Sequence, residues 1–261
     1  MSVALVGLAF VLGLSLGSFA NVVIYRVPVG MSVVQPRSRC PQCGKPIRAR
    51  HNAPVVSWLW LRGRCADCRA PISVRYPLVE LSTGVAFGLI VAMSGLRWQT
   101  FLLLVFALFS IILAAIDLDV GRLPDAVVRP FAAVTAVVVV IGCGIDGTWA
   151  PTLRALIAAT CIGLLYFIAY AVYPHGMGFG DVKLAPVLGA TLGVFGWGAV
   201  VVGTFAGFLW GVLAGVVAMI VTRKIRKVRI PFGPWMFAGA WTGVVCGQQV
   251  WSWYLHTVLV K

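Results

Sequence analysis

The chain has 261 residues, of which 61 % are hydrophobic and only 11 % are charged, and this composition excludes a soluble globular domain. Its formal net charge is +14, from 21 Lys and Arg against seven Asp and Glu. Membrane β-barrels are built from alternating segments of about ten residues, whereas the apolar runs here are longer and continuous. We therefore predict an all-α, polytopic membrane helix bundle.

Eight apolar stretches are expected to cross the membrane. They cover residues 3–25, 77–95, 100–116, 126–144, 151–173, 182–197, 198–221 and 231–255. The first basic residue, Arg26, follows the first stretch instead of preceding it, so an uncleaved span is favoured over a secretory signal peptide. The chain then divides into a first transmembrane helix (1–25), a small loop outside the membrane (26–76) and a transmembrane domain (77–261).

Four cysteines form two pairs in the loop 26–76. The pairs are Cys40-Pro-Gln-Cys43 and Cys65-Ala-Asp-Cys68, with 21 residues between them. Two such knuckles match the tetrahedral ligand set of a structural zinc site, which leaves no open position for a reacting water. Two disulfides are the alternative, and they would not persist if the loop faces a reducing compartment.

Two of the few carboxylates lie at the edges of apolar stretches. Asp117 follows the third stretch and Asp181 precedes the sixth. A carboxylate at the edge of a bilayer costs free energy and marks function by default, although Asp117 at a helix end and Asp181 as a helix N-cap are structural alternatives. Two predicted spans lie between them, so we expect both side chains on the same membrane face.

Glycines surround the second carboxylate, in the sequence GMGFGDVKL at 176–184. Gly178 and Gly180 permit close backbone approach by a helix or an extended substrate, and with Lys183 they are expected to support the site. Asp119 is expected to be a local helper or solvated, and Asp125 to cap the fourth span. His175 is a further candidate participant.

Two carboxylates that approach closely cannot both ionise, so such a pair offers one base and one acid. This arrangement suits hydrolysis of a peptide bond by an activated water, without a covalent intermediate. Two other classes of protein remain as alternatives: a proton-coupled transporter, in which membrane carboxylates relay protons, and a non-catalytic assembly platform that docks through its zinc loop.

The basic residues indicate the orientation. With eight spans and the loop 26–76 inside, eighteen of the 21 Lys and Arg lie on the cytoplasmic side, and Arg97, Arg154 and Lys261 on the other. Both carboxylates and the zinc loop then face the cytoplasm. The positive charge lies where anionic head groups are, so membrane lipids are the expected partner and nucleic acid is not.

Six ordered motifs resemble those of the type IV prepilin peptidases, a bacterial family of integral-membrane aspartic proteases of the GxGD type. They are GSFANVVIYRVP (17–28), the two cysteine pairs, SVRYPLVELSTG (73–84), IDLDVGRLPD (116–125), GMGFGDVKL (176–184) and IPFGPWM (230–236). By this resemblance Asp117 and Asp181 are the catalytic pair, the four cysteines hold zinc, and residues 77–261 form the aspartic peptidase domain.

Members of that family cut the short basic leader from prepilins and pseudopilins at the cytoplasmic face of the inner membrane. Many also methylate the new N-terminal residue with S-adenosylmethionine, and the complete zinc loop favours that second activity over a peptidase-only relative. No residues for binding the methyl donor can be assigned from the sequence. Glu80, the only glutamate in the chain, is either a contributor or a hydrogen-bonded acid at the membrane interface.

Overall fold

The structure is a computed structural model that describes residues 2–174, 176–222 and 231–259. It divides into two compact units, residues 1–112 and 113–261. Across these described ranges the chain is helical, and its only extended pairing consists of two isolated β-bridges, Arg39 with Pro46 and Arg64 with Pro71. The predicted all-α class is confirmed.

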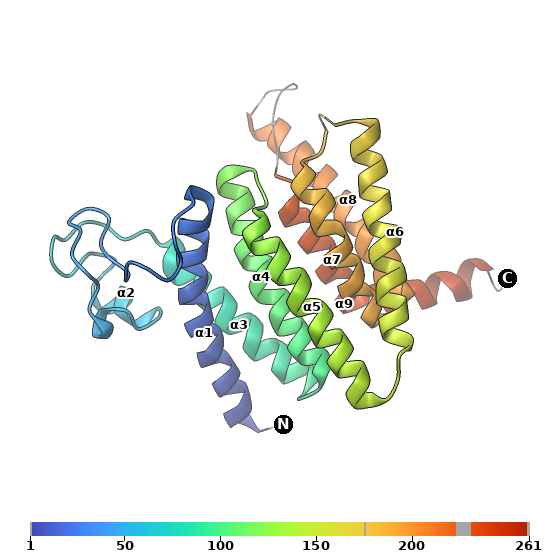
Figure 1. The fold of residues 1–261 in the computed structure, drawn as a ribbon, viewed down its shortest axis with the longest axis horizontal. Coiled ribbons are helices and arrows are strands. Elements are labelled where there is room, and N and C mark those ends of the chain that lie inside the picture. Colours follow the sequence, from blue (N-terminus) through green and yellow to red (C-terminus); the bar gives the residue numbers. More distant parts are fainter. Residues whose placement is uncertain (1, 175, 223–230, 260–261) are drawn as a thin grey trace. The chain divides into compact units, whose positions relative to one another are not determined.

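The first unit contains two long helices that pack side by side, α1 (Val3–Arg26) and α3 (Arg75–Ser94) (Figure 1). The loop between them holds the short 3₁₀ turns η1 (Val27–Val29) and η2 (Ala49–His51) and the helix α2 (Val56–Trp60). The next helix, α4 (Trp98–Val120), begins in this unit and ends in the second.

Small residues bring α1 and α3 into close contact. A Cβ added at Gly13 would lie 2.7 Å from the Thr83 carbonyl oxygen, and one at Gly17 would lie 2.7 Å from the Glu80 Cα. Asn21 adds a side-chain hydrogen bond to the Tyr76 carbonyl at 3.0 Å. Glycine at these two positions lets the backbones approach as they commonly do in membrane helix pairs.

The second unit contains five further long helices after the end of α4. They are α5 (Asp125–Asp146), α6 (Ala150–Val172), α7 (Phe179–Phe195), α8 (Trp197–Thr222) and α9 (Gly233–Tyr254), followed by the π-helical η3 (Leu255–Leu259). Helix α7 contacts α5, α6, α8 and α9, and eleven of its 17 residues are buried. It is therefore the central helix of this unit.

Glycines also set the spacing of α8 and α9. A Cβ at Gly243 would lie 2.7 Å from the Gly203 Cα, and one at Gly239 would overlap the backbone at Gly207. The two glycines of each helix are four residues apart, so they lie on one face of that helix. Close packing of backbones replaces the hydrophobic effect as the attraction between helices in lipid.

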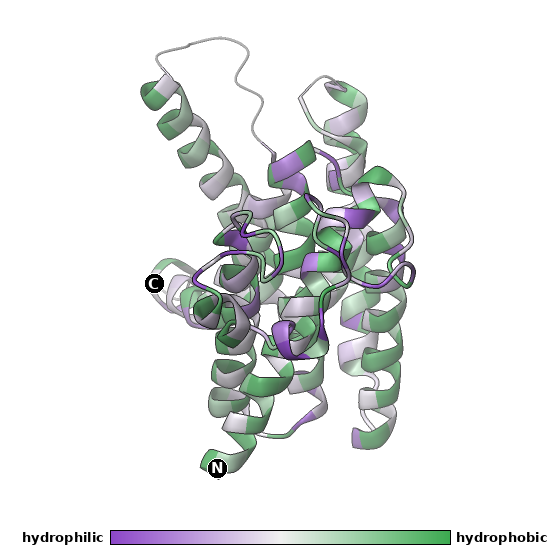
Figure 2. Ribbon diagram, turned by 90° about the vertical axis from the view of Figure 1, so that its left-hand side faces the viewer, coloured by the Kyte–Doolittle hydropathy of each residue, from purple (hydrophilic) through white to green (hydrophobic). Residues whose placement is uncertain are grey.

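Among the described residues, six helices are long and apolar enough to cross a membrane: α1 (together with η1), α3, α4, α5, α6 and α8. Figure 2 shows hydrophobic residues along the helices and hydrophilic ones gathered in the loops. Helices α7 and α9 are not among these six, so the count of eight spans stays a prediction. Helix α4 extends past the predicted end of the third span to Val120, and α7 begins at Phe179, before the predicted start of the sixth span.

Candidate active site and zinc centre

Asp117 lies in the last turn of α4 and is only 4 % exposed. Its Oδ2 accepts the backbone N–H of Gly233 at 2.9 Å. Gly233 is the first residue of α9, where backbone N–H groups have no partner within the helix and the helix dipole favours negative charge. The start of α9 therefore supplies a fixed donor to this buried carboxylate.

Asp181 is the third residue of α7 and is 6 % exposed. Its carboxylate accepts the N–H of Gly178, the N-cap residue, at 3.2 Å, and its own N–H donates to the Gly178 carbonyl at 3.0 Å. The side chain thus makes the return bond of a capping box, rather than serving as the N-cap itself. This hydrogen bond orients the carboxylate at the beginning of the central helix.

Leu123 lies between the starts of α7 and α9 and brings the two carboxylates to one place. A Cβ at Gly180 would lie 3.0 Å from the Leu123 Cβ, and a Cβ at Gly233 would lie 3.4 Å from its Cδ2 and 2.8 Å from the Asp117 Oδ2. The structure therefore brings together two residues that are far apart in the sequence.

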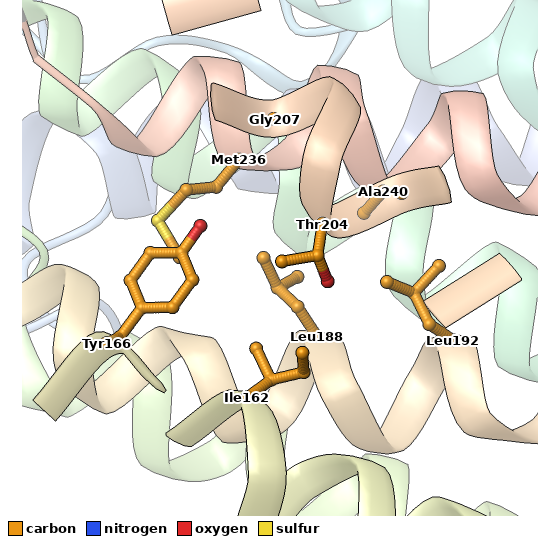
Figure 3. Close-up of a pocket in the computed structure, with 9 residues that line it drawn as sticks. Ile162, Tyr166, Leu188, Leu192, Thr204, Gly207, Met236 and Ala240 are labelled. Carbon is orange, nitrogen blue, oxygen red and sulfur yellow. The ribbon is translucent and has the colours of Figure 1, made fainter. Parts of the chain in front are cut away.

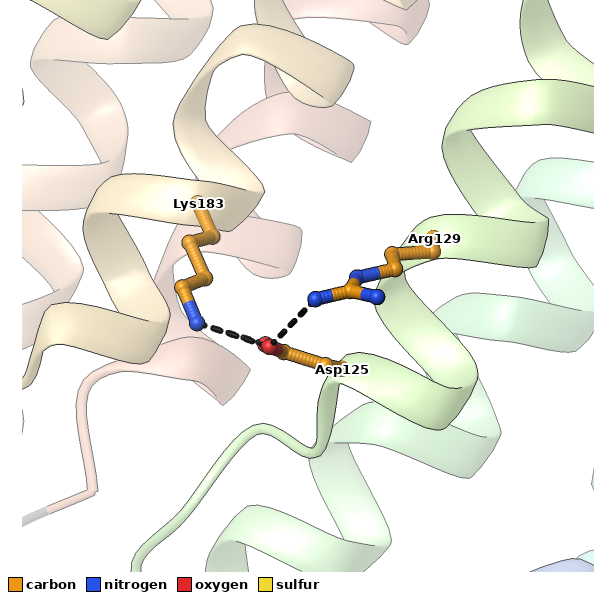
Figure 4. Close-up of polar contacts among 3 residues, drawn as sticks. All are labelled: Asp125, Arg129 and Lys183. Atoms are coloured by element: carbon orange, nitrogen blue, oxygen red, sulfur yellow. Dashed lines mark hydrogen bonds and ion pairs between the residues drawn. The ribbon is translucent and has the colours of Figure 1, made fainter.

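An ion pair joins α5 to α7 beside this junction. Lys183 donates to both carboxylate oxygens of Asp125, at 2.7 and 2.9 Å, and Arg129 reaches the same carboxylate at 3.3 Å (Figure 4). The expected N-cap role of Asp125 was wrong, because Pro124 occupies the cap and Asp125 is the first helical residue. Lys183 lies two residues after Asp181 and ties its helix to α5.

The other predicted residues differ in their placement. Gly180 packs against Leu123, and Gly178 is the N-cap of α7 with an ordinary negative φ of −72°. Asp119 is exposed, on α4, whereas Asp117 is buried. Outside the described residues lie the candidate His175, the first residue of the IPFGPWM motif, Ile230, and six of the basic residues counted for the orientation: Arg223, Lys224, Arg226, Lys227, Arg229 and Lys261.

The four loop cysteines converge in the first unit. Their sulfur atoms all lie within 4.8 Å of one another, and each thiol is free. The two knuckles repeat one backbone pattern: Gly44 donates to the Cys40 carbonyl at 2.9 Å, and Arg69 donates to the Cys65 carbonyl at 3.0 Å. Gly44 and Arg69 both take a left-handed φ, of 69° and 62° respectively.

These four residues fit a tetrahedral zinc ion. With Zn–S bonds of about 2.3 Å, sulfurs at the corners of a tetrahedron lie about 3.8 Å apart. The Cys40 and Cys68 sulfurs are separated by 3.8 Å, which is too long for a disulfide. The cluster can therefore hold a metal such as zinc.

Two family models match the chain. Residues 11–94 match the bacterial peptidase A24 N-terminal domain, and residues 104–222 match the type IV leader peptidase family. A prepilin leader peptidase/N-methyltransferase from Neisseria gonorrhoeae is 37 % identical, over 97 % of this chain and 96 % of that protein. The chain is a member of the type IV leader peptidase family.

Other family members are similar at nearly full length. Proteins with the same name from Aeromonas salmonicida and Pseudomonas putida are 33 % and 34 % identical, over 97 % and 94 % of this chain and 94 % and 92 % of their own. No solved structure matches. The first family segment contains the cysteine cluster, and the second contains Asp117 and Asp181.

This family member also has an aromatic cluster and a cavity that the sequence did not indicate. Tyr166, only 3 % exposed, stacks on Phe208 at 5.3 Å between ring centroids and lies 6.3 Å from Phe232, the residue before Gly233. Beside it is an apolar cavity between α6, α7, α8 and α9, into which Thr204 directs a hydroxyl without a partner among the described residues (Figure 3). Of the sequence motifs, only IPFGPWM (230–236) includes a residue of this region, Phe232.

Proposed function

We propose that this chain is a prepilin leader peptidase that cleaves with Asp117 and Asp181 and then methylates the exposed N-terminus. The observation that supports the proposal is that two buried carboxylates lie beside helix starts that pack against the same residue, Leu123, within the segment that matches the type IV leader peptidase family. The relatives' name supplies the substrate class, prepilins with a leader, and the second activity.

Cleavage requires one base and one acid at the scissile carbonyl. One aspartate removes a proton from water while the oxygen attacks the carbonyl carbon, and the other donates its proton to the carbonyl oxygen. The tetrahedral intermediate then breaks at the C–N bond: the leaving amine takes the proton that the first aspartate removed from water, and the second aspartate takes back a proton from a hydroxyl as the carbonyl re-forms. The donors from Gly233 and Gly178 hold the two carboxylates in place during these transfers.

The zinc proposed for the four cysteines has a structural role. Four thiolates complete the tetrahedron and leave no position for water or substrate. The loop from 27 to 74 has little regular structure apart from α2 and two 3₁₀ turns, so binding of the metal would supply much of its folding free energy. We place this loop and both aspartates at the cytoplasmic face of the inner membrane, following the distribution of basic residues.

The methyl donor proposed from the relatives' name is S-adenosylmethionine. The cavity beside Tyr166 does not fit it, because that cavity is apolar and its polar groups are a threonine and a tyrosine hydroxyl. A donor with a charged amino-acid group and a ribose needs several polar partners. The methyl-transfer site is therefore expected elsewhere in the chain.

The test is a cleavage assay with the full-length chain in lipid and a prepilin that carries its leader. Asp117→Asn and Asp181→Asn should each lower the cleavage rate by about 10²–10⁴-fold, since each removes one proton-transfer group. The matched control is Asp146→Asn. Asp146 is exposed at the C-terminal end of α5, so this variant should retain the cleavage rate. Mass spectrometry of the product reports both the cut and the methyl group.

Full cleavage by either active-site variant would rule out the aspartate pair as the catalyst. A wild-type chain that leaves the prepilin intact would instead favour the transporter or the assembly platform. Thermal unfolding of each variant separates lost chemistry from lost folding, because an Asp-to-Asn change preserves the shape of the side chain.

A further inference from the structure

Helix α2 in the cysteine loop presents an apolar face to the outside. Val56, Leu59 and Trp60 are 62 %, 62 % and 68 % exposed. They occupy positions i, i+3 and i+4, which share one face of a helix. Ser57, on the opposite face, is buried and accepts the Ala53 N–H at 3.0 Å. Three of the loop's exposed apolar side chains thus form an ordered group, which we call the α2 face (Val56, Leu59 and Trp60).

A hydrogen bond to α3 fixes the position of α2 along the axis of the membrane helices of the first unit. The N–H of Val55, at the start of α2, donates to the buried Glu80 carboxylate at 2.7 Å. Glu80 lies five residues into α3, about 7.5 Å along the helix axis from Arg75. Its side chain leans back towards the start of the helix, so α2 is held beside the first two turns of α3.

Aromatic side chains mark the same end of α1 and α3. Tyr25, in the last turn of α1, and Tyr76, in the first turn of α3, are 56 % and 40 % exposed. Tyrosine and tryptophan concentrate at the boundary between lipid tails and head groups. The two tyrosines therefore indicate that α2 lies at the depth of that boundary.

The charge around the α2 face selects the partner. Residues 27–76 contain nine Lys and Arg and a single acid, Asp67, which pairs with Arg48 at 3.3 Å and Lys45 at 3.7 Å. Arg50, Arg62 and Arg64, which flank α2, are exposed. An apolar face rimmed by cations fits an anionic lipid surface, whereas a basic prepilin leader would be repelled.

We propose that the α2 face inserts into the head-group boundary of an anionic bilayer and anchors the cysteine loop to the membrane. Trp60 and Leu59 enter the lipid, and the flanking arginines contact the phosphates. The Val55–Glu80 hydrogen bond fixes the depth of insertion. The strained φ of +61° at Val55 is maintained by this bond.

The experiment is hydroxyl-radical footprinting of the full-length chain in nanodiscs, with oxidation of Trp60 read by mass spectrometry. In discs that contain phosphatidylglycerol, Trp60 should be oxidised several-fold more slowly than expected for a side chain that is 68 % exposed in the protein alone. Protection should weaken in purely phosphatidylcholine discs and at high salt, because both reduce the attraction of the arginines.

A matched pair of variants tests the face itself. Leu59→Glu places a charge on the α2 face and should raise Trp60 oxidation, whereas Gln35→Glu adds the same charge at an exposed position of the loop before the first knuckle and should leave it unchanged. Metal content verifies that both loops are folded. Rapid oxidation of wild-type Trp60 in anionic discs would overturn the proposal, and protection that arises only on adding prepilin would assign the face to the substrate.

Discussion

Gly233 is the residue whose backbone most directly controls Asp117. Its N–H donates to the carboxylate, and the absence of a side chain leaves the space that the carboxylate occupies. Any other residue except proline keeps the donor but fills that space. The hydrogen bond and the close approach therefore both depend on glycine at the first position of α9.

We predict that Gly233→Ala lowers kcat more than it changes KM. The new Cβ would lie 2.8 Å from the Asp117 Oδ2, so the carboxylate must move, and a displacement of this kind costs up to about 10²-fold in rate. Steady-state cleavage of a prepilin measures both constants. Gly144→Ala on α5 meets nothing within 4 Å and is the control. A normal kcat for Gly233→Ala would contradict the assigned contact.

The residue type determined which candidate site residues could be predicted from the sequence. Asp117, Asp181 and the four cysteines were recognisable because carboxylates and thiols are scarce in this chain and their chemistry is specific. Gly233 was not, since every residue except proline offers the same backbone donor. Asp125 was misassigned because its main partner, Lys183, is 58 residues away and local capping rules do not detect such a pair.

Among the elements, the cysteine loop depends on two knuckles that meet only through their sulfurs. We predict that Cys40→Ser releases zinc from the purified chain and exposes the loop to proteases, because a three-thiolate site loses much of the binding free energy that folds it. Metal analysis and limited proteolysis measure this. Cys161→Ser, an exposed thiol on α6, should leave the metal content unchanged. Equal zinc in wild type and Cys40→Ser would remove the zinc assignment.

The tie between α5 and α7 is expected to matter more for activity than for stability. The side chains of Lys183 and Asp125 are 39 % and 37 % exposed, so solvent screens their ion pair and it contributes little to stability. The same pair nevertheless holds the helix that carries Asp181. Lys183→Met should therefore reduce kcat clearly while the unfolding temperature falls little.

A charge swap distinguishes the pair from either residue alone. The double variant Asp125→Lys with Lys183→Asp should recover part of the activity that each single change removes. Lys45→Gln, which breaks an ion pair in the cysteine loop, is the matched control and should leave cleavage intact. No recovery in the double variant would show that Lys183 acts in another way.

The apolar runs predicted which segments form helices, but they did not predict where those helices begin and end. Polar residues end an apolar run at residue 116, yet α4 continues because Asp117 finds a donor at α9 and Asp119 remains exposed. In the same way α7 begins before residue 182, since Gly178 and Asp181 cap each other. Tertiary and capping bonds therefore extended both helices beyond their apolar segments.

For the molecule as a whole, composition was sufficient to predict a helical membrane bundle, because backbone groups in lipid must be satisfied within helices or closed barrels. The place where α4, α7 and α9 meet could not be derived that way. It depends on glycines at 180 and 233 that admit Leu123, and a list of spans does not specify which helices become neighbours.

The course of the last three helices argues for eight spans. Helix α8 runs antiparallel to α9: a Cβ at Gly211 would contact the Phe232 ring at 2.6 Å, and one at Gly198 would lie 2.9 Å from the Gly247 carbonyl oxygen. Because α8 is long and apolar enough to cross the membrane, α9 should cross it alongside α8. Helix α7 is only about 26 Å long, but its neighbours bury it, so it needs little lipid contact of its own.

We therefore predict that Thr222, at the end of α8, lies on the same side as the cysteine loop. A phosphatase fused after Thr222 should be inactive and a fluorescent protein at the same point should be bright, because the first needs export and the second a reducing cytoplasm. A fusion after Trp149, between α5 and α6, is the control and should give the opposite result. If α7 does not cross, α8 carries Thr222 to the outer side, and the phosphatase becomes active.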